Sequence, residues 1–380
     1  MAEITRFSFP TQIRYGPGAR AALAEFADEL QVTRPLLVTD RGLPGTEAYR
    51  LTATALAQTW SGGYEASEGV HPNPVEADVE AVFRAYEDGG CDGVVGLGGG
   101  SALDVAKAAR LRIAFPDLSL MDIAGREWPR RLAPFCAIPT TAGTGSEVGR
   151  SSVVTIPALG RKAVVGGQPL LADLAILDPE LTVGLPPALT AATGMDALTH
   201  AIESFVCPVL HPMCDGIALE AIRLVRLHLP VAYANGTDLQ ARGLMQIAAA
   251  MGAVAFQKDL GVAHSLSHPL SSEFGLHHGL ANATVLPFTV RFNGETDSGQ
   301  YGRVAQALGL PAGDDPAAQV AECLAELNVC IGITQRLRDL GVPQTALPEL
   351  AAKAMQDGCH LTNPRSCTEA DMLRLYEEAW

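Results

Sequence analysis

Short apolar runs alternate with segments of helical spacing in the first half of the chain, and this alternation constrains the fold more than any other feature. Continuous apolarity is typical of strands that are buried on both faces of a parallel sheet. The runs, most of which end in polar or glycine-rich turns, are Leu36–Asp40, Gly93–Leu97, Phe135–Pro139 and Leu174–Asp178. Between them, Pro74–Ala85 and Ala102–Ile113 place apolar residues three and four positions apart. The pattern predicts βαβ units around a parallel sheet.

The pattern changes after Asp178, because no comparable series of buried strands follows. Long runs with helical spacing take its place, namely Ala191–Phe205, Gly216–Leu229, Leu239–Phe256, Ala317–Leu340 and Thr368–Ala379. We therefore predict two domains, an α/β domain over residues 1–185 and an all-helical domain over residues 186–380.

The charge balance excludes several classes of partner. The 380 residues include 27 Lys+Arg and 42 Asp+Glu, which gives a net charge of 27 − 42 = −15. Binding to nucleic acid or to an anionic membrane surface requires a surplus of basic side chains. Such partners are therefore excluded.

The cysteines and the apolar stretches bear on the location of the protein. The eight cysteines form no Cys-x-x-Cys pair, and neither a signal peptide nor an apolar stretch of about 20 residues is evident. We expect a soluble cytoplasmic protein with reduced thiols that acts on a small molecule.

A glycine-rich loop leaves one predicted strand and enters a predicted helix. It contains Gly98, Gly99, Gly100 and Ser101, and Asp104 lies in the first turn of the helix. Glycines allow a pyrophosphate to approach the backbone, and the helix N-terminus offers amide donors. A tight structural turn is the alternative interpretation, because the spacing differs from Gly-x-Gly-x-x-Gly. Asp40 ends an earlier strand, where it can accept a hydrogen bond from an adenosine ribose or simply form a turn.

A second loop of hydroxyl and glycine residues follows the strand at Phe135–Pro139. It contains Thr140, Thr141, Thr144 and Glu147. Ligands of open α/β sheets bind beyond the carboxyl ends of the strands, so two such loops together indicate a dinucleotide.

Histidines gather in the helical half at spacings that suit a metal. Asp196 and His200 are four residues apart, His264 and His268 repeat this relation, and His278 follows. A spacing of four places two side chains on one helix face, where they can hold the same cation. Ordinary core or surface histidines are the alternative. Mixed nitrogen and oxygen ligands suit Fe²⁺, Zn²⁺, Co²⁺ or Ni²⁺ without selecting one of them.

Taken together, these motifs make the chain resemble the iron-containing (group III) alcohol dehydrogenases over nearly its whole length. The matching strings are Gly98-Gly99-Gly100-Ser101 with Asp104 and Lys107, Pro139-Thr140-Thr141 with Gly143-Thr144 and Ser146-Glu147, Gly194-Met195-Asp196-Ala197 with His200, His264 and His268 with His278-Gly279, and Asn363-Pro364-Arg365. The resemblance implies a Rossmann-like dinucleotide-binding domain followed by an all-α metal-binding domain, as in the dehydroquinate synthase-like fold.

The resemblance also implies roles for individual residues. The metal ligands are Asp196, His200, His264 and His278, and His268 assists proton transfer. The residues implied to contact the cofactor are Asp40, Gly98, Gly99, Gly100, Ser101, Asp104, Thr140, Thr141, Thr144 and Lys162. The expected cofactors are Fe²⁺, or Zn²⁺ or another divalent transition metal in its place, and NAD, which Asp40 favours over NADP. A homo-oligomer, most simply a dimer, is expected.

Arg150 and His360 are further candidate catalytic residues that bear on the substrate. Arg150 follows the threonine-rich loop, and an arginine can hold a carboxylate bidentately. The chain looks like the branch that contains 4-hydroxybutyrate dehydrogenases because of this arginine together with three further strings, namely Phe256-Gln257-Lys258-x-Leu260-Gly261, Leu276-His277-His278-Gly279 and Cys359-His360-x-Thr362-Asn363-Pro364. We therefore hypothesise an ω-hydroxy acid such as 4-hydroxybutyrate, which yields succinate semialdehyde. The alternatives are that Arg150 pairs with Glu147 or faces solvent, that the substrate is a neutral alcohol or diol, or that the protein is a dehydroquinate synthase-like lyase.

Overall fold

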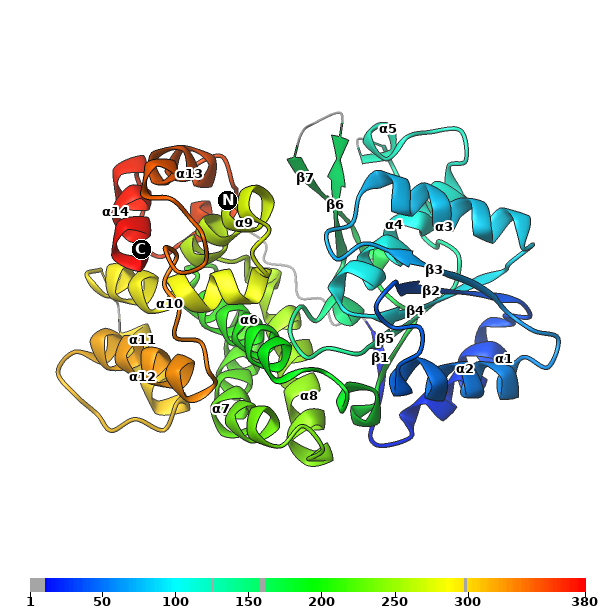
Figure 1. Ribbon diagram of the computed structural model, residues 1–380, viewed down its shortest axis with the longest axis horizontal. Helices are drawn as coiled ribbons and strands as arrows, with labels where there is room; N and C mark the ends of the chain where they lie inside the picture. Colours follow the sequence, from blue (N-terminus) through cyan, green and yellow to red (C-terminus); the bar gives the residue numbers. More distant parts are fainter. Residues whose placement is uncertain (1–10, 125, 158–160, 297–298) are drawn as a thin grey trace. The chain divides into compact units, whose positions relative to one another are not determined.

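The computed structural model describes residues 11–124, 126–157, 161–296 and 299–380 (Figure 1). Its contacts divide the chain into two compact units, of which the first ends at Leu185 and the second covers Pro186–Trp380. Throughout the described residues, no helix has both the length and the apolarity needed to cross a bilayer.

The first unit is built on a six-stranded parallel sheet. Its strands are β1 (Gln12–Tyr15), β2 (Pro35–Asp40), β3 (Glu65–Val70), β4 (Gly93–Gly98), β5 (Phe135–Pro139) and β8 (Leu174–Leu177). Their order across the sheet is β1-β8-β5-β4-β2-β3. The four strands predicted from apolar runs are therefore confirmed. The sequence analysis missed β1 and β3, which lie at the two edges and carry mostly polar or exposed residues.

Successive residues of the central strands point to opposite faces of this sheet, and each face is covered by helices (Figure 1). Leu36 and Val38 of β2 pack with α3 and α4, whereas Leu37 packs with α1 and α2. The helices are α1 (Leu23–Leu30), α2 (Glu47–Thr59), α3 (Glu76–Asp88), α4 (Gly100–Ala114) and the short α5 (Leu120–Ala124). Burial on both faces explains why these strands are continuously apolar.

An antiparallel hairpin accompanies the main sheet. It consists of β6 (Ser151–Ile156) and β7 (Arg161–Gly166), and the sequence analysis did not predict it. Asp104 of α4 anchors the hairpin, because its carboxylate accepts a hydrogen bond from Val153 N at 2.9 Å and its backbone carbonyl accepts one from Ser152 Oγ at 2.7 Å.

The described residues of the second unit form helices and loops and contain no strand. The helices are α6 (Pro187–Val206), α7 (Pro212–Ala234), α8 (Leu239–Ala255), α9 (Val262–Phe274), α10 (His278–Gly294), α11 (Gln300–Ala307), α12 (Pro316–Cys330), α13 (Leu347–Ala354) and α14 (Glu369–Ala379). The prediction of one helical run over Ala317–Leu340 was wrong beyond Cys330. There Gly332 adopts a φ of +77°, and Ile333 N returns to Asn328 O, which ends the helix.

The start of α10 lies against α6 at a position that only glycine tolerates. A Cβ atom added to Gly279 would stand 2.0 Å from the carbonyl oxygen of Ala192 and 3.1 Å from Asp196 Cβ. The backbone of α6 cannot yield as a flexible side chain would, so this glycine sets the separation of the two helices.

We predict that Gly279→Ala destabilises the protein by about 3 kcal/mol, as overpacking of a rigid contact does. Gly216 on α7 is the matched control, because nothing lies within 4 Å of its added Cβ. Gly216→Ala is expected to be neutral or stabilising by up to about 1 kcal/mol. Urea denaturation of both variants, stripped of metal, measures the difference, and equal midpoints would refute this account of the contact.

Candidate functional site

Three helices of the second unit place a carboxylate and three imidazoles together in its interior. Asp196 and His200 lie on one face of α6, His264 lies on α9, and His278 is the first residue of α10. The Asp196 carboxylate is 3.9 Å from His200 Nε2 and 3.5 Å from His278 Nε2. The His264 ring stacks at 4.8 Å from the ring of His200. The structure thus brings together all four predicted metal ligands.

The donor atoms of this group converge as a cation would require. One potential ligand atom each of Asp196, His200 and His264 lies within 4.8 Å of the others. The side-chain amide nitrogen of Asn282 is 2.9 Å from Asp196 Oδ1, 3.2 Å from His278 Nε2 and 3.4 Å from His264 Nε2. Three potential ligand atoms therefore lie around one electropositive group. Three nitrogens and one oxygen suit Fe²⁺ or Zn²⁺, so these residues fit the metal that the sequence predicts.

The charges at this site are set by burial and by the neighbouring side chains. Burial alone would raise the pKa of Asp196, but the imidazoles of His200, His278 and His264 and the hydrogen bond from Asn282 hold it at about 2. Burial keeps the pKa of His278 well below its usual value. An ionised carboxylate beside a neutral imidazole is the protonation state in which these groups bind metal.

Glu203 contacts His264, one of the four predicted metal ligands, and the sequence analysis missed it. Its carboxylate lies 2.6 Å from His264 Nδ1 and accepts a hydrogen bond from Ala263 N at 2.6 Å. A carboxylate on Nδ1 fixes the imidazole tautomer that leaves Nε2 free to bind a metal. A signal existed in the sequence, because Glu203 lies seven residues after Asp196 and so shares its face of α6.

His268 belongs to a neighbouring hydrogen-bond network. Its Nδ1 lies 2.7 Å from Asp357 Oδ2, and its ring stacks 5.2 Å from that of His278. Asp357 Oδ1 accepts a hydrogen bond from Ser265 Oγ at 2.9 Å, and Ser265 Oγ accepts one from His360 N at 2.9 Å. The imidazole Nδ1 of His360 lies 2.6 Å from the backbone carbonyl oxygen of Asp357. His360 therefore joins the network of His268 through its backbone N–H and its imidazole Nδ1.

In the first unit, the predicted cofactor residues gather at the carboxyl ends of β2, β4 and β5. Gly98 has a φ of +146°, and an added Cβ would stand 3.0 Å from Asp40 Oδ2. A Cβ on Gly99 would be 3.3 Å from Thr141, and one on Gly100 would be 2.8 Å from Thr144. The chain goes from β2 outward to β3 and then returns to β4, so the strand order reverses between β2 and β4. Open α/β sheets bind ligands at such a reversal.

Other predicted residues serve structural contacts in this unit. Ser101 Oγ donates a hydrogen bond to Pro72 O at 2.6 Å, and Thr140 N donates one to Gly98 O at 3.0 Å. Asp104 holds the hairpin, as described above. Lys162 lies in β7, where its backbone pairs with Thr155 of β6. The side chain of Lys162 lies outside the described part of the chain.

Arg150 lies between the threonine-rich loop and β6, and its side chain is exposed. Glu147, the acidic partner considered in the sequence analysis, is instead buried, and burial raises its pKa to about 7. Among the described residues, no carboxylate forms an ion pair with Arg150.

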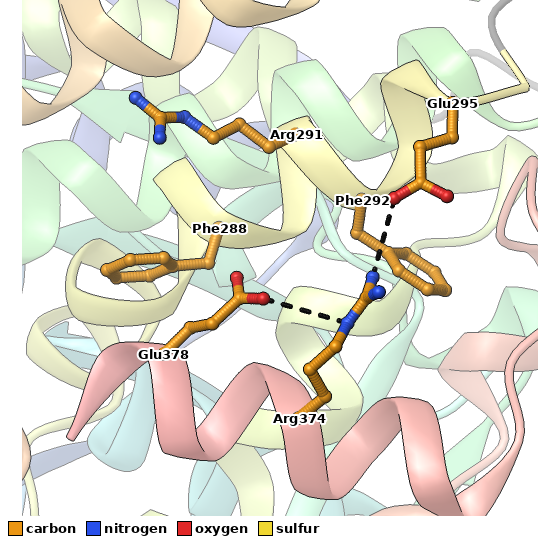
Figure 2. Close-up of a pocket in the computed structure, with 6 residues that line it drawn as sticks. All are labelled: Phe288, Arg291, Phe292, Glu295, Arg374 and Glu378. Carbon is orange, nitrogen blue, oxygen red and sulfur yellow. Dashed lines mark ion pairs between the residues drawn. The ribbon is translucent and has the colours of Figure 1, made fainter.

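A separate cavity of about 380 Å³ lies between α10 and α14 (Figure 2). Figure 2 shows two phenylalanines beside a set of charged side chains, in which Arg374 pairs with Glu295 and Glu378. The lining residues are Phe288, Arg291, Phe292, Glu295, Arg374 and Glu378. They include none of the predicted site residues.

Comparison with known proteins gives matches along almost the whole chain. Residues 10–179 match the family described as iron-containing alcohol dehydrogenase, and residues 190–380 match the C-terminal part of the Fe-containing alcohol dehydrogenase family. The 4-hydroxybutyrate dehydrogenase of Cupriavidus necator is 38% identical, and the match covers 97% of this chain and 98% of the relative. The 1,3-propanediol dehydrogenase of Klebsiella pneumoniae is 36% identical, with 96% of each chain covered.

A solved structure gives a similar result. The crystal structure of sulfoacetaldehyde reductase from Bifidobacterium kashiwanohense in complex with NAD+ is 32% identical and superimposes with a TM-score of 0.90. This superposition covers 100% of the present chain and 99% of the other.

Glu203→Gln is expected to weaken metal binding by about tenfold, because the neutral amide holds the His264 tautomer less firmly than a carboxylate does. The measurement is competition between the protein and a chelator for Co²⁺ or Zn²⁺. Glu220→Gln on the exposed face of α7, where Glu220 pairs with Arg223, is the matched control and should bind like the wild type. Equal affinity of Glu203→Gln and wild type would contradict the role assigned to Glu203.

Proposed function

The chain belongs to the iron-containing alcohol dehydrogenase family, and on that premise we propose that it oxidises a short ω-hydroxy acid with NAD+ as hydride acceptor. The main support for metal-dependent alcohol oxidation is that Asp196 and three imidazoles lie together in the interior of the helical unit. In the opposite direction the same groups reduce the corresponding semialdehyde.

We assign the metal to Asp196, His200, His264 and His278, with Glu203 behind His264. These residues would hold a ferrous ion, which would supply Lewis-acid stabilisation of negative charge on the substrate oxygen. The protein contributes a fixed set of donors, in which burial favours neutral His278 and the imidazoles favour ionised Asp196, and the amide nitrogen of Asn282 contacts three of the four.

The dinucleotide is proposed to bind at the carboxyl ends of β2 and β4. Gly98, Gly99 and Gly100 leave room there for a pyrophosphate at the N-terminus of α4. Asp40 stands beside this loop, where a carboxylate accepts hydrogen bonds from a ribose and repels a 2′-phosphate. This arrangement supports NAD over NADP, as does the NAD+ complex of the sulfoacetaldehyde reductase.

His268 is proposed to carry the proton that the alcohol releases. Asp357 binds its Nδ1, which leaves Nε2 as the nitrogen that can accept a proton. The His268 side chain is 36% exposed, so the imidazole can pass the proton on to water.

The hydroxy acid is proposed because of Arg150 and the relatives. Arg150 presents an exposed guanidinium beside the threonine-rich loop, and a guanidinium matches a carboxylate bidentately. The Cupriavidus relative is a 4-hydroxybutyrate dehydrogenase. A neutral diol is the second candidate substrate, because the Klebsiella relative is a 1,3-propanediol dehydrogenase with almost the same identity.

The assembly and location of the enzyme are further parts of the proposal. We propose that the enzyme is cytoplasmic, as its scattered cysteines suggest, and that it forms a homodimer, as the family resemblance implies. The net charge of −15 supports solubility of such an assembly.

Arg150→Ala is expected to lower kcat/KM for 4-hydroxybutyrate by about tenfold to a hundredfold, because a charge-assisted bidentate contact is lost. Activity on 1-butanol and 1,3-propanediol should change little. Steady-state NADH formation with the three substrates gives the comparison, and Arg84→Ala on α3, another exposed arginine, is the matched control. A proportional loss on all three substrates, or no loss on any, would reject Arg150 as the carboxylate anchor.

A further inference from the structure

A second group of metal-binding side chains lies outside the four proposed ligands. It consists of His268 on α9, Asp357, and Cys359 at the start of the 3₁₀ helix η8 (Cys359–Thr362). One potential ligand atom of each lies within 4.8 Å of the others. All three residues are partly exposed, and the His268 side chain is 36% exposed.

The group is ordered before any ion binds. Asp357 Oδ1 accepts hydrogen bonds from Ser265 Oγ and from Cys359 N, both at 2.9 Å, and Oδ2 lies 2.7 Å from His268 Nδ1. These contacts hold the carboxylate between the imidazole and the residue that carries the thiol. The arrangement offers one nitrogen, one oxygen and one sulfur to the same point.

We propose that His268, Asp357 and Cys359 form a second site for a divalent transition metal of borderline softness, such as Zn²⁺ or Co²⁺. A thiolate, an imidazole and a carboxylate are ligands that zinc accepts in tetrahedral sites, with water in the fourth position. The set contains a thiolate, whereas the first site contains none, so the two sites differ in chemistry.

Binding at this site exchanges protons and transfers no electrons. The ion takes the place of the proton between His268 Nδ1 and Asp357 Oδ2, and that proton moves to Nε2 of the same imidazole. The proton of the Cys359 S–H bond goes to solvent as the metal–sulfur bond forms. Burial, followed by the charge of Asp357, raises the pKa of the Cys359 thiol well above its usual value. The second site offers three side-chain ligands and the first offers four, so the second site is expected to bind the ion more weakly than the first.

Occupancy of the second site would inhibit turnover, and this consequence rests on the proposed function. A metal on Nδ1 of a neutral imidazole leaves the ring proton on Nε2. His268 then has no nitrogen free to accept the proton of the alcohol. Excess zinc or cobalt is therefore expected to inhibit the enzyme without displacing the first metal.

The experiment titrates Co²⁺ into the full chain already loaded with one equivalent of Co²⁺. Cobalt bound to a thiolate gives a near-ultraviolet sulfur-to-metal charge-transfer band, whereas cobalt bound only to imidazole and carboxylate does not. The expected result is a band that grows with the second equivalent in the wild type. It should be lost in Cys359→Ser and weakened by about tenfold or more in apparent affinity in Asp357→Asn.

Cys330→Ser is the matched control, because Cys330 is an exposed cysteine on α12 outside the group. It should keep the band and the activity of the wild type. The visible spectrum of the first cobalt equivalent and the far-ultraviolet circular dichroism show whether each variant is folded. No thiolate band in the wild type, or a band that survives Cys359→Ser, would overturn the proposal.

Turnover in the same titration separates this inference from the proposed function. In the wild type, NADH formation should fall as the thiolate band grows, and the ratio of rates at excess and at one equivalent should return toward unity in Cys359→Ser. Absence of turnover at one equivalent would count against the proposed function, while the band would still decide whether the second site exists.

Discussion

The helical unit is organised around a buried carboxylate that three imidazoles surround. Asp196 is 4% exposed, and an isolated charge at such a depth is strongly unfavourable unless it is paired or binds a metal. Three features place partners beside this carboxylate. His200 lies four residues further along α6, and Asn282 donates a hydrogen bond from its amide. Gly279 lets α10 approach α6, which brings His278 close. A bound dication would compensate the charge most completely. The packing of α6, α9 and α10 thus serves chemistry and stability together.

In the α/β unit, burial of the sheet determines where a dinucleotide can bind. The central strands of its sheet are apolar on both faces, so their polar groups concentrate where these strands end and loops begin. At the reversal between β2 and β4, glycine is required because any side chain at Gly98 would crowd Asp40 and Ala102. The same crowding that demands glycine leaves the backbone accessible, which is the property that a pyrophosphate needs.

Sequence periodicity could predict what is local in this protein. It predicted the four central strands and the pairing of Asp196 with His200, because burial on both faces and a spacing of four leave direct patterns. It did not separate the roles of His264 and His268, which share a helix but face different carboxylates, Glu203 and Asp357. Asp357 lies 89 residues from His268, so no local pattern could connect them. The edge strands β1 and β3 were not predicted, because half-exposed strands contain no continuous apolar run.

The account is tested most directly by following the carbinol hydrogen of deuterated 4-hydroxybutyrate in protein stripped of metal and then reloaded with Fe²⁺ without oxygen. The account predicts no NAD+ reduction by the stripped protein. With iron restored, deuterium should pass from the substrate carbon to the nicotinamide. Equal turnover without metal, or loss of the deuterium to water instead of to NAD+, would contradict metal-assisted hydride transfer by this chain.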